Sequence, residues 1–205
     1  MKILLATKNV HKIREFREMF RPIKRLDLYT LLDFPNYEPP EETGETFEEN
    51  AHLKALHAAR NLQMLAIADD SGLVVPALQG KPGVRSRRFA SLDATDKENN
   101  RKLLDLMGSL TDLERGAYYD CVLALAKPDG TIKTVLGRCE GMIIDEERGS
   151  SGFGYDSLFM KHDYDKTFGE LDESTKNRVS HRRKAFEKLL ILLESLLIKE
   201  NGCST

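Results

Sequence analysis

The sequence contains few cysteines and no excess of charge of either sign. Cys121, Cys139 and Cys203 are far apart and show no CxxC or Cys/His spacing. This argues against a structural zinc site and favours free thiols in a reducing compartment. The 31 basic and 33 acidic residues give a formal charge of -2, so the chain lacks the global field that holds proteins on polynucleotides or anionic membranes. We therefore expect neither a nucleic-acid polymer nor a membrane as a partner.

Long hydrophobic runs are also missing. The first apolar run, 3–6, is too short for a signal peptide, and no other run reaches the about 18 residues that span a bilayer. The expected location is therefore the cytoplasm. With 205 residues, 40% of them apolar, the chain can supply one sizeable core. We expect a single domain over residues 1–200 and a flexible tail at 201–205.

Short apolar runs alternate with helical patterns along the chain. Thr46 and Glu49 form the signature of a capping box before a helix, and Asp129-Gly130 is typical of a hairpin turn. Strands are expected at 3–6, 26–29, 65–68, 117–126, 131–136 and 158–160, and helices after Asn9, Thr46, Thr95 and Ser180. The pattern predicts an α/β fold, with a central mixed sheet flanked by helices and a β-hairpin lobe.

The first candidate site is the junction between the first strand and the first helix, Thr7-Lys8-Asn9-Val10-His11-Lys12. Such a junction presents backbone N–H groups and the positive end of the helix dipole, and three of its side chains add donors for phosphate oxygens. The GxxxxGK[ST] spacing of a P-loop is absent. Alternatively, Asn9 simply caps the helix and the lysines are solvated.

The second candidate is Asp69-Asp70-Ser71-Gly72, which is expected to end the strand at 65–68. Open α/β sheets bind ligands at the carboxyl edges of their strands. Adjacent carboxylates repel each other unless a cation such as Mg²⁺ offsets their charge. Because side chains alternate along a strand, we expect only one of the two carboxylates to contact the metal. The alternative is an acidic strand terminator with Asp69 or Ser71 as a cap.

The loop before the second helix supplies another carboxylate. A carboxylate of the Glu41-Glu42 pair could complete a metal site begun by Asp70, although loop glutamates are commonly just solvated. Asn50 and Lys54 lie one helical turn apart, with Lys54 at the edge of the apolar stripe. We expect both to face a phosphate-binding cleft; the alternative for Lys54 is a buried stem with a solvated head.

Two further segments carry binding chemistry. Phe153-Gly154-Tyr155-Asp156 follows a glycine-rich break, so an aromatic ring can stack on a purine while the backbone approaches the base edge. Lys176 and the cluster around His181-Arg182 place cations at a helix start, where the helix dipole disfavours them. An anionic or planar ligand explains that placement, and a plain basic surface is the alternative.

Read together, these segments resemble the inosine triphosphate pyrophosphatase family. The matching motifs, collinear from Met1 to the last helix, are Thr7-x-Asn9-x-x-Lys12, Glu41-Glu42-Thr43-Gly44, Glu49-Asn50-Ala51 with Lys54, Ala68-Asp69-Asp70-Ser71-Gly72-Leu73, Gly152-Phe153-Gly154-Tyr155-Asp156 and Ser180-His181-Arg182. The resemblance implies hydrolysis of the non-standard purine nucleotides ITP, dITP and XTP to the monophosphate and pyrophosphate. It also implies Mg²⁺ dependence, a homodimer and a role in cleansing the nucleotide pool.

The resemblance assigns a role to each matching position. Asp70 is expected to be the proton acceptor and, with Glu41, to bind magnesium. The residues implied to bind substrate are Thr7, Lys8, Asn9, Val10, His11 and Lys12 for the triphosphate, Ser71 and Lys176, and Phe153, Gly154, Tyr155, Asp156, His181 and Arg182 around the base. Lys8 and His11 depart from the family, in which glycines are frequent there. Because these two residues are not glycine, the backbone conformation of the first loop can differ from that of the family.

The expected reaction is in-line attack of water on the α-phosphorus, with positioning and electrostatics supplying most of the rate. Because Asp70 cannot be both a tight metal ligand and a strong free base, proton transfer through a water held by the metal is an alternative. The rival functions are a purine-nucleotide-binding regulator without hydrolysis, a single-stranded nucleic-acid binding module and a kinase-like transferase. Net acidity disfavours the second, and the third lacks its signatures.

Overall fold

The computed structural model describes the backbone of residues 1–24 and 26–202 and the side chains of residues 1–24 and 26–195. Its strands are β1 (Lys2–Leu5), β2 (Asp27–Thr30), β3 (Leu65–Val74), β4 (Gly116–Ala126), β5 (Ile132–Ile143) and β6 (Phe159–Lys161). Its α-helices are α1 (Val10–Phe20), α2 (Phe47–Leu62), α3 (Asp96–Met107), α4 (Glu173–Val179) and α5 (His181–Gly202). Of the tail expected at 201–205, residues 201 and 202 are therefore helical, and 203–205 lie outside the described residues.

The strands form one six-stranded sheet in the order β2-β1-β3-β4-β5-β6. β1 pairs in parallel with β2 and β3, whereas β5 and β6 are antiparallel. β4 and β5 are joined by a tight turn in which the Lys127 N–H donates to the Thr131 carbonyl at 2.8 Å. The predicted α/β class, with a mixed sheet, flanking helices and a hairpin, is confirmed.

The chain divides into two compact units, each assembled from separate segments. The first contains Met1–Asp70, Cys121–Gly137 and the chain from Arg182 onward; the second contains Ser71–Asp120 and Arg138–His181. By these boundaries β3, β4 and β5 each contribute residues to both units.

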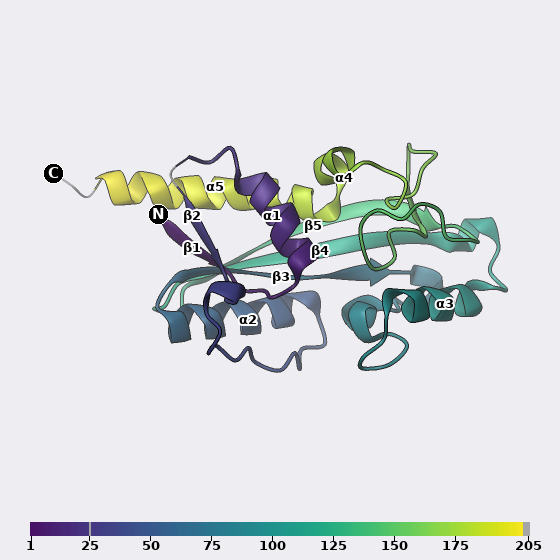
Figure 1. Cartoon of the computed structure of the whole chain (residues 1–205), viewed down its shortest axis with the longest axis horizontal. Helices are drawn as coiled ribbons and strands as arrows, with labels where there is room; N and C mark the ends of the chain where they lie inside the picture. The colour runs from purple at the N-terminus through teal and green to yellow at the C-terminus, as the bar shows by residue number, and fades with distance from the viewer. Residues whose placement is uncertain (25, 203–205) are drawn as a thin grey trace. The chain divides into compact units, whose positions relative to one another are not determined.

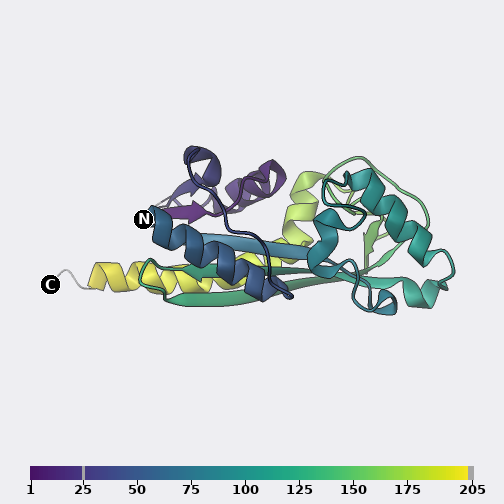
Figure 2. The same ribbon diagram turned by 90° about the horizontal axis from the view of Figure 1, so that it is seen from below.

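The first unit has an apolar core on each face of its strands, because strand side chains alternate in direction. Leu5 and Ile67 pack with α1 and α5, whereas Leu4 and Ala68 pack with α2. Figure 1 shows α1 and α5 on one face of β1 and β3 and α2 on the other. Figure 2, seen from below, places α2 in front of these strands. Neighbouring residues of β3 therefore face different helices.

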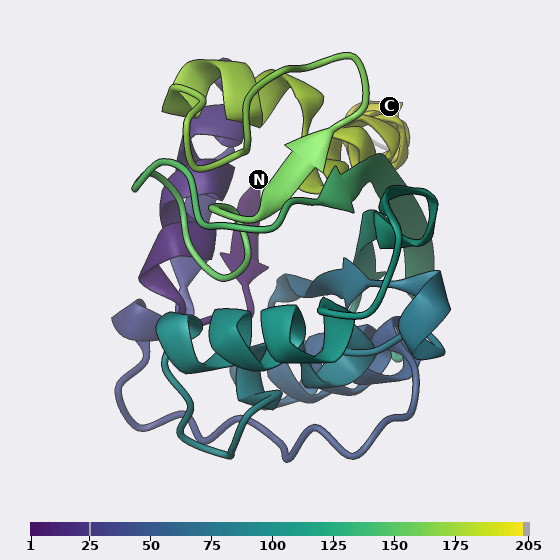
Figure 3. The ribbon, with the colours of Figure 1, turned by 90° about the vertical axis from the view of Figure 1, so that its right-hand side faces the viewer.

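The second unit has its own core, in which Tyr119, Phe159 and Phe168 are buried. The ring centroids of Tyr119 and Phe159 lie 4.8 Å apart in an edge arrangement, which is a favourable aromatic geometry. Figure 3 shows two elements of this unit, α3 in teal and β6 in green. Its loops between β5 and α4 carry several of the expected site residues.

The strand at 65–68 differs from its prediction. We expected Asp69–Gly72 to end it, but β3 continues without a break to Val74. The pairing of β1 with β3 stops at Leu5 and Ile67, whereas β4 is the neighbour of β3 on its other side. The acidic pair is tolerated inside a strand because cations from other elements neutralise it, as described below.

Two smaller differences concern the second half of the chain. β5 extends to Ile143 instead of ending at 136, and the short helix α4 before Ser180 was not predicted. The predicted capping box at the start of α2 is confirmed, since the Thr46 side chain accepts the Glu49 N–H at 3.1 Å. Among the described residues, none of the helices combines the length and the apolar character needed to cross a bilayer.

Candidate active site

The acidic pair lies just beyond the end of the β1–β3 pairing. Ala6 donates its N–H to the Ile67 carbonyl at 2.7 Å, and Asp69 and Asp70 are the second and third residues after Ile67. The chain that leaves β1 becomes the Thr7–Asn9 loop. The site in the first unit is therefore at the carboxyl end of β1, a position where parallel sheets commonly bind ligands, and not at the end of β3.

Asp69 faces α1 and α5. Its carboxylate oxygens lie 2.5 Å from Lys12 Nζ and 2.6 Å from Arg182 Nε. Arg182 also pairs with Glu15, and the Cys121 thiol donates to Asp69 at 3.4 Å. The Asp69 side chain is 0% exposed. This is a buried network in which two carboxylates balance two cations.

The electrostatics of this network fix the charge of Asp69. Burial opposes its ionisation, but the charges of Arg182 and Lys12, with the hydrogen bonds they donate, hold the pKa of Asp69 well below 3.8. The pKa of Arg182 is raised well above its usual value: burial opposes its charge, but Asp69 and Glu15 outweigh that penalty. Both groups therefore stay ionised at neutral pH.

Asp70 faces α2, so the two carboxylates do point to opposite faces, as strand alternation predicts. Lys54 Nζ lies 2.7 Å from Asp70 Oδ1, 2.9 Å from Glu42 Oε1 and 2.9 Å from the Asp69 carbonyl oxygen. The Asp70 side chain is 11% exposed. Burial raises the pKa of Asp70 by more than Lys54 and Lys12 lower it, which makes this carboxylate the better proton acceptor of the pair.

The loop carboxylate that meets Asp70 is Glu42. Glu41 is exposed, and its carbonyl oxygen accepts the Thr43 N–H at 3.1 Å. The resemblance implied Glu41 as the metal ligand beside Asp70. In the structure the adjacent residue, Glu42, shares Lys54 with Asp70.

The donor set fits a magnesium ion. In the part of the chain that the structure describes, no three His, Cys, Asp or Glu side chains surround a common metal position. Magnesium, however, is usually held by one or two carboxylates and completes its shell with water and substrate phosphates. Glu42 and Asp70 supply two carboxylates, and the Lys54 ammonium donates a hydrogen bond to each of them.

The Thr7–Lys12 segment adopts the capping arrangement. The Asn9 side chain accepts the N–H groups of His11 and Lys12 at 3.0 and 3.2 Å, and the Thr7 hydroxyl accepts the Asn9 N–H at 3.1 Å. Lys8 Nζ donates to the Tyr37 carbonyl at 3.4 Å. The first N–H groups of a helix have no acceptor within the helix. Here the Asn9 side chain accepts those of His11 and Lys12, two donors that we expected to face phosphate.

Asn50 does not face a cleft with Lys54, and that expectation is corrected. Asn50 is fully buried, and its Oδ1 accepts the Gly44 N–H at 2.8 Å. A Cβ at Gly44 would lie 2.7 Å from this oxygen, so the close approach requires glycine. A buried amide needs hydrogen-bond partners, and the partner here is the backbone of the loop that carries Glu42. Asn50 fixes this loop.

Arg182 is likewise placed differently from the expectation that it contacts the base. Its guanidinium is 1% exposed and is held between Asp69 and Glu15. A buried guanidinium is stable only when carboxylates compensate its desolvation. These carboxylates explain why α5 can begin with cations despite the helix dipole.

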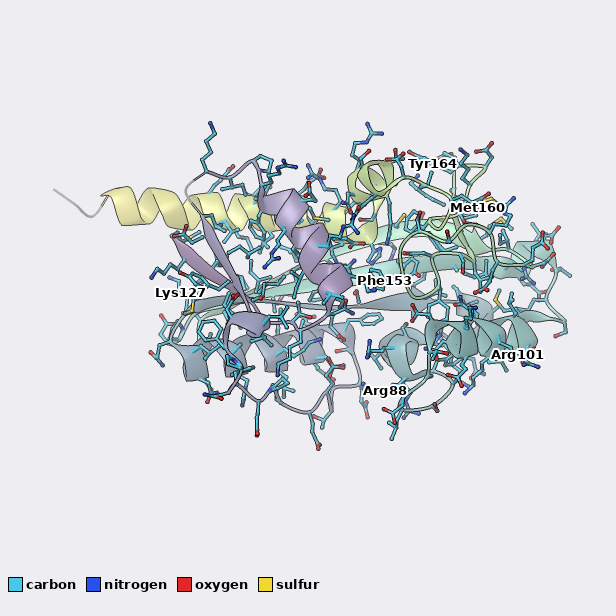
Figure 4. All side chains as sticks on the ribbon, in the orientation of Figure 1. Arg88, Arg101, Lys127, Phe153, Met160 and Tyr164 are labelled. Atoms are coloured by element: carbon cyan, nitrogen blue, oxygen red, sulfur yellow. The ribbon has the colours of Figure 1, made fainter. Side chains whose placement is uncertain are left out.

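In the second unit, three of the expected residues form one cluster. Asp156 accepts the Phe153 N–H at 2.8 Å and lies 2.6 Å from Lys176 Nζ. The same ammonium is 4.8 Å from the centroid of the Phe153 ring, within cation–π range. Phe153, labelled in Figure 4, lies in the loop between β5 and β6. A Cβ at Gly152 would lie 2.1 Å from Asp156 Oδ2, so this turn also depends on glycine.

Neighbouring contacts hold the rest of this loop. The Gly154 N–H donates to Asp96 Oδ2 at 2.7 Å, and the Tyr155 hydroxyl donates to the Ser86 carbonyl at 2.8 Å. Tyr155 is buried, and burial raises its pKa. Tyr155 is therefore part of the core, and Phe153 is the more exposed aromatic of the pair.

His181 stacks on Tyr119, with ring centroids 4.6 Å apart and planes 11° from parallel. Ser71, at the start of the second unit, is half-buried. The stack with Tyr119 orients the imidazole, so Tyr119 is a residue of this cluster that the sequence analysis did not single out.

Comparison with known proteins identifies the family of this chain. The sequence pattern of the Ham1 family matches residues 3–192. The chain belongs to the Ham1 family. A relative from Protochlamydia amoebophila, named dITP/XTP pyrophosphatase, is 59% identical over 197 residues, which cover 96% of this chain and 99% of the relative. One of the same name from Chlamydia abortus is 50% identical, with 98% of each chain covered.

Solved Ham1 structures agree. A HAM1 protein from Coxiella burnetii superimposes with a TM-score of 0.87 at 39% identity, over 95% of this chain and 99% of that one. The Ham1 protein of Staphylococcus aureus gives a TM-score of 0.84 at 39% identity, with the same coverage. The resemblance to the inosine triphosphate pyrophosphatase family is thereby confirmed.

Two residues of this Ham1-family chain that contact site residues were not predicted from the sequence: Glu15 and Tyr119. Glu15 did leave a signal, because it is a charged residue on the apolar stripe of α1, three positions after Lys12. A charge on a buried helix face requires a partner. Tyr119 left no such signal, since a single aromatic residue in a strand is usually part of a core.

Proposed function

We propose that this protein hydrolyses non-standard purine nucleoside triphosphates, namely dITP, XTP and ITP, to the monophosphate and pyrophosphate, and so cleanses the nucleotide pool. The observation that carries the proposal is 59% identity, over 96% of the chain, to a protein named dITP/XTP pyrophosphatase. The geometry of the first unit supports it, since carboxylates and lysines gather at the carboxyl end of β1. Nucleotide regulation without hydrolysis is not favoured.

Asp70 is the proposed catalytic residue, accepting a proton from the water that attacks the α-phosphorus. Its pKa, raised by burial, supports this role. We propose that Mg²⁺ is held by Asp70 and Glu42, with Glu42 taking the place first given to Glu41 because it shares Lys54 with Asp70. When bound, the ion neutralises charge on the phosphates and on the departing pyrophosphate.

The substrate residues divide by chemistry. Lysines and hydroxyls of the Thr7–Lys12 segment, together with Lys54, suit the triphosphate because they supply cationic and neutral donors. Phe153 and Lys176 suit a 6-keto purine, since the ring offers a stacking face and the ammonium donates to a carbonyl oxygen. The remaining proposed substrate residues are Ser71, Gly154, Tyr155, Asp156 and His181. We assign Arg182 to positioning, through its buried pairs with Asp69 and Glu15.

The proposal includes a cytoplasmic homodimer. Light scattering coupled to gel filtration measures the assembly, and a mass of one chain, 23.3 kDa, would contradict the dimer without affecting the catalytic proposal.

The decisive test is product identification. The protein is incubated with Mg²⁺ and, separately, dITP, XTP, ATP and GTP, and products are separated by ion-exchange chromatography. We expect deoxyinosine monophosphate and pyrophosphate in equal amounts from dITP, and little turnover of ATP or GTP. Release of orthophosphate would overturn the reaction, and binding of dITP without product would support a regulator instead.

A further inference from the structure

The Lys54 ammonium occupies the position of a cation among oxygens of three residues. It lies 2.7 Å from Asp70 Oδ1, 2.9 Å from Glu42 Oε1 and 2.9 Å from the Asp69 carbonyl oxygen. All four residues belong to the first unit. A carbonyl oxygen and a carboxylate oxygen of β3, with a carboxylate oxygen of the loop before α2, are also ligands typical of a hard divalent cation. The lysine and a metal ion therefore require the same oxygens.

We infer that Lys54 is a resident counter-ion that holds the metal site together before the metal arrives and must be displaced for the metal to bind. This inference rests on the proposed function, because it concerns the same metal site. It assigns Lys54 a role other than the phosphate contact suggested by its place on α2.

The charges of the site explain why an exchange is favourable. Glu42 and Asp70 carry two negative charges, and the Lys54 ammonium contacts both carboxylates with a single positive charge. A divalent ion compensates both carboxylates, so it can replace the ammonium, whereas the ammonium and the ion at the same oxygens repel each other. The Lys54 side chain is only 13% exposed, so solvent screens this competition weakly.

The anchoring of the surrounding groups supports an exchange without rearrangement. Asp69 is held by Lys12 and Arg182 through its carboxylate, which leaves its carbonyl oxygen in place when Lys54 departs. Asn50 fixes the Gly44 backbone two residues after Glu42. The displaced ammonium becomes available to a phosphate group, so arrival of the metal and of the triphosphate would favour each other.

The test measures metal binding to the nucleotide-free protein. MgCl₂ alone is titrated calorimetrically into the wild-type protein and into Lys54→Met and Lys54→Gln. Lys8→Met is the matched control, because it removes the same charge from a lysine that bonds the Tyr37 carbonyl instead. We expect both Lys54 variants to bind Mg²⁺ about tenfold more tightly than wild type or more, and Lys8→Met to bind as wild type does. Unchanged or weaker binding by folded Lys54 variants would overturn the inference.

A second measurement uses the wild-type protein, so that it does not depend on the folding of a variant. Reductive methylation of Lys54, quantified by peptide mass spectrometry relative to Lys8, should increase as MgCl₂ is added, because the displaced ammonium loses its partners. Continued protection of Lys54 at saturating Mg²⁺ would contradict displacement. Pyrophosphate release from dITP by wild type is measured in parallel; if it persists while both metal experiments fail, the inference is wrong and the proposed function stands.

Discussion

Asp69 and Asp70 are adjacent in β3, yet their carboxylates pair with cations from opposite layers of the first unit. Asp69 pairs with Lys12 of α1 and Arg182 of α5, and Asp70 pairs with Lys54 of α2. Strand alternation alone produces this division. It gives the two carboxylates different environments, and the first predictions follow from that difference.

Asp70→Asn should reduce pyrophosphate release from dITP by about 10²–10⁴-fold, because an amide neither accepts the proton nor compensates a cation as a carboxylate does. The fold should survive, since Lys54 retains Glu42 and the Asp69 carbonyl. Steady-state kinetics and circular dichroism measure the two effects. Near-normal turnover in the folded variant would remove Asp70 from the catalytic role.

Asp69→Asn should instead act on stability. Removing this charge breaks the ion pairs of Asp69 with Lys12 and with Arg182, and breaking a buried pair on one side costs about 3–5 kcal/mol. Urea unfolding at neutral pH measures the loss. Asp70→Asn is the matched control, and an equal loss in both variants would contradict the division of roles.

The same pair predicts a pH dependence. The folded-state pKa of Asp69 is well below its ordinary value of 3.8, so in acid the unfolded chain takes up this proton first. Its contribution to the free energy of unfolding is present above 3.8 and is lost as pH falls toward the folded-state pKa. The difference between wild type and Asp69→Asn, from urea unfolding, should therefore narrow below pH 3.8. A difference that widens in acid would mean that Asp69 is not held ionised.

Gly152→Ala should destabilise the second unit more than Gly154→Ala. Both glycines have positive φ, +80° and +64°, so each variant carries backbone strain of about 1–3 kcal/mol. Only at Gly152 would the added Cβ also collide, 2.1 Å from Asp156 Oδ2, whereas nothing lies within 4 Å at Gly154. Thermal unfolding of the two variants isolates the contact with Asp156. Equal Tm values would show that the turn relaxes without cost.

The local elements were predictable because their signals are local. Thr46 and Glu49 mark the start of α2 in four residues of sequence, and the structure contains the reciprocal hydrogen bonds. The same holds for Thr95 and Glu98 at α3. The course of β3 was not predictable in this way, because Asp69 is neutralised by Arg182, which lies 113 residues further along the chain.

The candidate site shows the same limit. The residues alone left the choice between Glu41 and Glu42 open, because the direction of a side chain in an irregular loop has no period. Likewise, an asparagine one turn before Lys54 resembles a ligand-binding residue until its hydrogen bond to Gly44 is known. Which polar groups satisfy one another is a tertiary property, and it decides which of them remain for a ligand.

The interleaving of the two units has a consequence for inheritance. The boundaries fall after Asp70, Asp120, Gly137 and His181, so the chain changes unit four times. Neither unit is one continuous stretch of the chain. The first unit includes both Met1 and the chain from Arg182 onward, so a gene fragment that holds all of it also holds all of the second. Recombination at a single position therefore cannot exchange one whole unit and leave the other unchanged.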